Sequence, residues 1–161
     1  MQNLKVETVL ISVNIAFFVA VFLLNSDRVQ KAIEMCSECL ILLNNTNQHI
    51  KDQFISLRYD AIYGVLFRAY RRISDYKNAE RYGRKLLVLY NESGRLVQEG
   101  YMSKALAEIV ESQNKFTEAK NLYERGLDIM RQTGEKNGVA NCYERLGILC
   151  KLFKQYDRAR E

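Results

Sequence analysis

The sequence has no proline and a single histidine, His49, among its 161 residues. Proline breaks the interior of a helix, so its absence is typical of a chain that is helical nearly throughout. The histidine follows an asparagine-rich segment, and no serine or cysteine nucleophile with an orienting acid accompanies it. A glycine-rich loop that would cradle phosphate is also lacking. These absences argue against an enzyme and against a bound cofactor.

Cysteine is scarce as well, with Cys36, Cys39, Cys142 and Cys150. Four cysteines without a dense framework indicate a reducing compartment, and hence the cytoplasm, although an even number permits disulfides. Cys36 and Cys39 are spaced as half of a zinc site, but no second ligand pair follows, so we expect core packing and no metal. Cys142 and Cys150 are too far apart on one helix to form a disulfide, and we expect them to pack too.

The charge is only mildly basic. The net charge of +5 and the pI near 9.0 favour acidic partners slightly and are too small to indicate nucleic acid by themselves. A hydrophobic content of 48% is enough for the core of one modest domain.

Residues 1–27 form an apolar N-terminal segment that stands apart from the rest. Val9–Leu24 contains no charge over 16 residues, slightly fewer than the roughly 17–20 that a membrane span needs. A first repeat helix, a membrane anchor through residues 9–24 and a cleaved signal are the alternatives. A cleaved signal is disfavoured because this segment has neither the basic start nor the small-residue cleavage site of a secretory signal. A repeat helix should show a polar face, and Ile15–Leu24 shows none. The sequence leaves this segment open.

The rest of the chain, residues 28–161, is organised by a recurring pattern. Alanines recur 40 residues apart, and each follows an aromatic residue by three positions and a leucine by thirteen. Recurrence at such a period is the mark of stacked helical repeats. The three sets are Leu66, Tyr76 and Ala79, then Leu106, Phe116 and Ala119, then Leu146, Tyr156 and Ala159.

Hydrophobic periodicity and turn residues predict where the helices lie. We expect helices at about residues 28–43, 50–72, 75–91, 96–112, 116–132 and 137–153, with a further helix starting at Tyr156. Ser26-Asp27 and Ser74-Asp75 are predicted N-caps. Seven extra residues separate the first two repeats. The last element stops after six residues, which predicts about three repeats, the last truncated, in a fragment of a longer array.

These motifs resemble the tetratricopeptide repeat of the long-period subtype, found in LGN/Pins-type and kinesin-light-chain-type arrays. The best match is Tyr143-Glu-Arg-Leu146-Gly147 with Tyr156 and Ala159, while the middle repeat has Ser103 where an aromatic is usual. The resemblance implies an all-α, right-handed superhelix of stacked antiparallel helix pairs. It also implies a non-enzymatic scaffold that binds a peptide or helix of unknown identity in its concave groove.

The family geometry projects a set of charged and polar side chains onto the concave face. Arginine side chains there could fork onto partner carboxylates, although charge runs are more often solvated helix faces. A membrane-anchored scaffold and an RNA-binding repeat protein are the alternatives, and the absence of a long basic stripe argues against RNA. The projected residues are Arg68, Arg71, Arg72, Lys104, Glu108, Glu111, Asn141, Glu144, Arg145 and Lys151.

Overall fold

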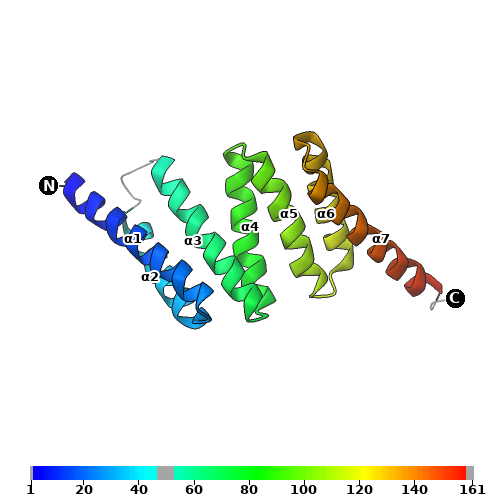
Figure 1. The fold of residues 1–161 in the computed structure, drawn as a ribbon, viewed down its shortest axis with the longest axis horizontal. Coiled ribbons are helices and arrows are strands. Elements are labelled where there is room, and N and C mark those ends of the chain that lie inside the picture. The colour runs from blue at the N-terminus through cyan, green and yellow to red at the C-terminus, as the bar shows by residue number, and fades with distance from the viewer. Residues whose placement is uncertain (1, 47–52, 159–161) are drawn as a thin grey trace. The chain divides into compact units, whose positions relative to one another are not determined.

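The computed structural model describes residues 2–46 and 53–158, and these residues form α-helices and no strand. Figure 1 shows consecutive helices running alternately up and down within each part of the chain, the all-α arrangement of helix pairs that the repeat pattern predicts. The helices are α1 (Gln2–Asn25), α2 (Val29–Thr46), α3 (Gln53–Arg72), α4 (Tyr76–Glu92), α5 (Leu96–Glu111), α6 (Phe116–Thr133) and α7 (Lys136–Arg158).

The chain divides within α4 into two compact units, Met1–Tyr82 and Gly83–Glu161. Unit 1 therefore contains α1, α2, α3 and the first turns of α4. Unit 2 contains the remainder of α4 with α5, α6 and α7.

Helices α1, α3, α4, α5 and α6 end in one recurring turn. After each of them comes a residue with positive φ, and the next backbone N–H donates to the carbonyl five residues earlier, as in a Schellman motif. From Ser74 onward the positive-φ residues are 20 positions apart, so the 40-residue period of the sequence is two equal helix-and-turn units. These residues are Asp27, Ser74, Gly94, Asn114 and Gly134.

This turn overturns the predicted N-cap at Ser26-Asp27 and leaves Asp75 as the cap at the second predicted site, Ser74-Asp75. Asp27 and Ser74 adopt positive φ and end the preceding helices, and the Ser26 hydroxyl donates back to the Phe22 carbonyl. At the second site the cap itself is confirmed, because Asp75 accepts a 3.1 Å bond from the backbone N–H of Asn78 and a 2.7 Å bond from its side chain. These two hydrogen bonds lower the pKa of Asp75.

The predicted break before Tyr156 is wrong, because α7 continues to Arg158. The 20-residue spacing would put the next positive-φ residue at Lys154. A long side chain is disfavoured in that conformation, whereas glycine and asparagine tolerate it. Ala159 and His49 lie outside the described residues. So does most of the seven-residue insertion, which falls between Thr46 and α3.

Unit 1 has a core shared by α1, α2 and α3. Val13, Ala20 and Leu24 of α1 are buried, and so are Cys36 and Cys39 of α2, as the core-packing interpretation predicts. Burial, with the neighbouring Cys39 as a second cause, raises the pKa of Cys36 to about 12. This thiol therefore stays protonated at neutral pH, which disfavours it as a nucleophile.

Helix α1 packs against α2 and α3. The structure describes no helix that combines the length and the hydropathy needed to cross a membrane.

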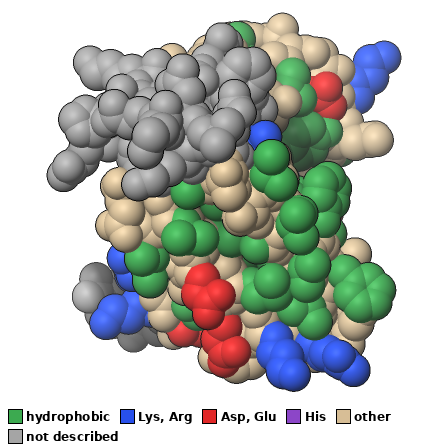
Figure 2. Space-filling model, turned by 90° about the vertical axis from the view of Figure 1, so that its left-hand side faces the viewer, with side chains coloured by type: hydrophobic (Ala, Val, Ile, Leu, Met, Phe, Trp, Pro, Cys, Tyr) green, Lys and Arg blue, Asp and Glu red, His purple; other side chains and the backbone are tan. Residues whose placement is uncertain are grey.

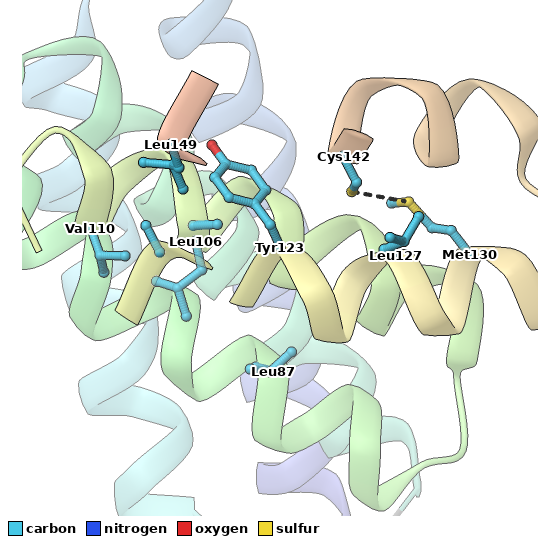
Figure 3. Close-up of a cluster of buried hydrophobic side chains, with 10 residues drawn as sticks. Leu87, Leu106, Val110, Tyr123, Leu127, Met130, Cys142 and Leu149 are labelled. Carbon is cyan, nitrogen blue, oxygen red and sulfur yellow. Dashed lines mark hydrogen bonds between the residues drawn. The ribbon is translucent and has the colours of Figure 1, made fainter. Parts of the chain in front are cut away.

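Unit 2 has its own buried cluster, shown in Figure 3. Tyr123 and Leu127 of α6 lie among Leu106 and Val110 of α5 and Leu149 of α7, and all of these side chains are at most 7% exposed. Cys142 is buried in the same cluster with its sulfur 4.0 Å from the sulfur of Met130. Cys150 is exposed, so the prediction that it packs in the core is wrong.

The crossing of α5 and α6 depends on small residues. A Cβ on Gly126 would lie 3.2 Å from the carbonyl oxygen of Gly100 and 3.5 Å from the Cβ of Ser103. The close approach explains why serine replaces the usual aromatic at position 103: a large side chain would meet the backbone of α6.

Replacing Gly138 by alanine should lower the free energy of unfolding by about 1–3 kcal/mol, the usual effect of overpacking. A Cβ at this position in α7 would lie 2.3 Å from the Met130 sulfur, and Met130 is fully buried. Urea unfolding followed by circular dichroism measures the change.

Gly147→Ala is the matched control on the same helix. No heavy atom of a described residue lies within 4 Å of a Cβ there, so alanine should stabilise the helix by about 0.5–1 kcal/mol. Equal effects of the two substitutions would contradict the packing described for Gly138.

Candidate functional site

The polar surface of unit 2 is formed by the first helices of its pairs, α5 and α7. We call it the inner-helix face and define it as Lys104, Glu108, Glu111, Asn141 and Arg145. The Lys104 ammonium lies 3.0 Å from the Glu108 carboxylate, one turn further along α5. Both side chains are 22% exposed, so the pair is partly withdrawn from water and more strongly coupled than a fully solvated pair.

Glu111 of α5 connects this helix to both α6 and α7. Its Oε2 accepts a 2.7 Å hydrogen bond from the Tyr123 hydroxyl of α6, and its Oε1 lies 3.8 Å from the Arg145 guanidinium of α7. Burial and this hydrogen bond raise the pKa of Tyr123, so the hydroxyl remains a donor at all physiological pH values. The carboxylate is thereby fixed between a buried tyrosine and an exposed arginine.

Cys142 lies beneath the same surface. Burial raises the pKa of its thiol, the positive charge of Lys104 opposes that shift, and the negative charge of Glu108 adds to it. The buried, protonated thiol supports packing and offers no nucleophile.

Asn141 lies one turn before Arg145 on α7 and is exposed. Together, the predicted residues of unit 2 present an ammonium, a guanidinium, carboxylates and an amide across two adjacent helices. Such a surface can orient the backbone and side chains of a bound peptide. Within the part of the chain that the structure describes, no group of three or more histidine, cysteine, aspartate or glutamate residues is arranged to hold a metal ion.

The three arginines predicted in unit 1 differ in their surroundings. Arg68 and Arg71 are exposed on α3, and the Arg68 Nε donates to the Gly64 carbonyl of its own helix at 3.3 Å. Arg72 instead donates to the Leu24 carbonyl at 2.6 Å and pairs with Asp27 at 2.8 Å. Leu24 is in the last turn of α1, where carbonyls lack helical partners. Arg72 therefore fastens α3 to the end of α1.

Sequence reasoning missed two groupings in unit 2. The Tyr101 hydroxyl donates to Glu135 at 2.6 Å, and the Arg131 guanidinium lies 5.5 Å from the centre of the Tyr143 ring. The second contact borders a shallow apolar hollow where α6 turns into α7, lined also by Met130 and Val139. The first pair is 34 positions apart in the sequence and the second joins two different helices, so no local sequence pattern indicates either contact.

Comparison with known proteins supports the repeat architecture. Residues 100–161 match the family model described as tetratricopeptide repeat. No curated protein matches the sequence.

Two solved structures have a similar fold. A TPR-like protein from Chlorobium tepidum superposes with a TM-score of 0.69 at 14% identity, covering 92% of this chain and 99% of that one. BtubC (BKLC) from P. vanneervenii gives a TM-score of 0.59 at 19% identity, covering 99% of this chain and 69% of that one. At these identities the likeness shows the fold alone.

Proposed function

We propose that this chain, whose residues 100–161 are tetratricopeptide repeats, is a non-enzymatic interaction scaffold that binds an extended peptide or a helix over the inner-helix face. The observation that carries the proposal is the joining of α5 and α7 through Glu111. It fixes cations and carboxylates from two successive helix pairs on one surface.

The charge arrangement favours a peptide ligand with both polar and acidic groups. Lys104 and Arg145 are each matched by a carboxylate of the chain itself, so an acidic ligand group must compete with Glu108 and Glu111 for them. Such exchange gives orientation and specificity more than affinity. Affinity would then come from apolar ligand groups contacting the helices between the charges.

In unit 1 the proposal assigns ligand contact to Arg68 and Arg71, whose side chains are exposed. Arg72 was also predicted to contact the ligand, but a ligand would have to displace it from Leu24 and Asp27. Reversing the charge at Arg72 would therefore disturb the attachment of α1 as well as any binding. Arg68→Glu is the cleaner probe in this unit.

Peptide selection tests the proposal directly. The full chain would be used to select peptides from a random display library, and the affinity of selected peptides would be measured by calorimetry. Lys104→Ala/Arg145→Ala should weaken binding by about 10- to 100-fold, because both cations of the inner-helix face are removed. Circular dichroism should show unchanged helix content.

The matched control removes the same charges from the second helix of the pair. Lys120 and Arg131 are both on α6, and Lys120→Ala/Arg131→Ala should leave the affinity within about twofold. Equal losses in the two double variants would contradict binding at the inner-helix face. Selection of no peptide, with salt-sensitive binding of single-stranded RNA instead, would contradict the scaffold function itself.

A further inference from the structure

Helix α1 carries a second apolar stripe that is turned away from the core of unit 1. Ile11, Ile15, Phe18 and Phe22 are 59%, 60%, 71% and 66% exposed, whereas Val13 and Ala20 on the other side are fully buried. Figure 2, which views unit 1 from the side of α1 and α2, shows hydrophobic side chains gathered in a patch on this side.

An exposed stripe of this kind is unfavourable for an isolated array. The outermost helix of a stacked repeat protein needs a polar outer face to stay soluble, and contiguous apolar patches beyond a few hundred Å² mark interaction sites. The spacing of the stripe is also informative. Positions 11, 15, 18 and 22 are separated by four, three and four residues, the spacing of a coiled-coil seam.

We propose that this stripe is a dimer interface in which α1 packs antiparallel against α1 of a second copy of the chain. In an antiparallel pair centred between positions 15 and 18, Ile11 faces Phe22 of the other copy and Ile15 faces Phe18. Every layer then combines one isoleucine with one phenylalanine. Alternating large and small side chains across facing positions is what allows layers to interdigitate. A parallel pair would instead stack phenylalanine on phenylalanine and isoleucine on isoleucine.

The charge pattern also favours a second copy over a different partner. Between Thr8 and Ser26 the sequence has no lysine, arginine, aspartate or glutamate. A charged partner would find no charged side chain to pair with between these two positions, whereas an identical stripe supplies an uncharged and self-complementary surface. A twofold axis places the same residues on both sides of the interface, as closed dimers require.

The available area is sufficient for a specific contact. With Val19, which is 39% exposed, the stripe presents roughly 600 Å² of apolar surface per copy, since a phenylalanine side chain carries about 150–250 Å². Two copies together would bury roughly 1,200 Å², the lower limit for stable and specific interfaces. The proposal does not involve the inner-helix face, which belongs to unit 2.

The first test is the mass of the full chain in solution, measured by analytical ultracentrifugation over a range of concentrations. We expect the wild-type chain to be dimeric and Phe18→Glu to weaken the dimer roughly 100-fold, the effect of removing a central interface residue. Val88→Glu, at a residue of α4 that is 54% exposed, is the matched control and should remain dimeric. A monomeric wild-type chain, or a fully dimeric Phe18→Glu variant, would overturn the proposal.

The second test checks the antiparallel register. Phe18→Lys and Ile15→Glu should each be monomeric alone and should form a heterodimer when mixed, because position 18 faces position 15 of the other copy. A mixture of Phe18→Lys and Ile11→Glu should not form a heterodimer, because position 11 faces Phe22 of the other copy and not position 18. Heterodimer formation in both mixtures would contradict the antiparallel register. A monomeric wild-type chain that instead binds phosphatidylcholine vesicles would assign the stripe to a lipid surface and would also overturn the proposal.

Discussion

Replacing Tyr123 by alanine lowers the free energy of unfolding of unit 2 by about 3–5 kcal/mol, the loss typical of a buried aromatic residue. The Tyr123 ring is completely buried among side chains of the unit 2 cluster (Figure 3), so its removal leaves a cavity between α5, α6 and α7. The substitution also removes the hydroxyl that holds Glu111. Urea unfolding followed by circular dichroism, with hydrogen exchange of the α5, α6 and α7 amides, measures the loss.

Tyr123→Phe separates the two contributions. Phenylalanine keeps the ring and loses the hydrogen bond to a charged acceptor, which should cost about 1–2 kcal/mol. Tyr101→Phe is the control for the hydroxyl, since Tyr101 donates to Glu135 at the exposed surface and its loss should change stability by less than about 0.5 kcal/mol. A loss below about 1 kcal/mol for Tyr123→Ala would contradict the packing of this cluster.

Replacing Arg125 by methionine lowers stability by about 2–3 kcal/mol, because it strands a buried carboxylate. The Glu99 side chain in the first turn of α5 is only 4% exposed, and its Oε1 accepts a 2.5 Å bond from Arg125 of α6. Without Arg125, the amide of Asn91 at 3.5 Å remains as a weak donor. Removing one partner of a fully buried pair costs about 3–5 kcal/mol, and the partly exposed guanidinium makes the effect here smaller.

The double variant Glu99→Gln/Arg125→Met should be more stable than Arg125→Met, since no charge is then left buried alone. Lys120→Met is the control, because the Lys120–Glu124 pair at 3.7 Å lies on the exposed side of α6 and contributes at most about 0.5 kcal/mol. Urea unfolding of the wild-type chain and these three variants measures the free energies of unfolding to be compared. If Arg125→Met and Lys120→Met had equal effects, the Glu99 pair would not stabilise the crossing of α5 and α6.

Much of the fold could be predicted from sequence because it depends on local patterns. The alanine and aromatic spacing predicted the helix pairs, and the turns at Gly94 and Gly134 fell where glycine follows a polar run. The end of α7 was mispredicted for a related reason. The aromatic-to-alanine spacing continues through Tyr156, but Lys154 does not supply the turn that glycine or asparagine gives elsewhere.

The N-terminal helix could not be assigned from sequence, because both of its sides are apolar. Periodicity distinguishes a core face from a polar face, and α1 has a buried stripe and an exposed stripe of the same chemistry. In the structure α1 packs against α2 and α3, and these contacts involve residues distant in the sequence, so no local pattern indicates them.

For the candidate site, the helices that carry the proposed residues could be predicted, and the hydrogen-bond and ion-pair partners of those residues could not. Projection from the repeat pattern placed Lys104, Glu108 and Arg145 on the first helices of the pairs. The bonds from Tyr123 to Glu111 and from Arg72 to Leu24 join positions 12 and 48 residues apart, and no local rule relates them. The repeat pattern indicates which residues lie on the first helix of each pair. The contacts that hold those side chains in place depend on how the helices pack.

The binding of a ligand at the inner-helix face is tested most directly by site-specific photo-crosslinking. A photoreactive phenylalanine derivative would replace Asn141 on α7 or, as the matched position, Asn121 on α6, since both asparagines are exposed. Each full-length chain would be irradiated with a peptide selected from the display library. A crosslink at position 141 and none at position 121 is the result that the scaffold proposal predicts. A crosslink at position 121 alone would contradict it.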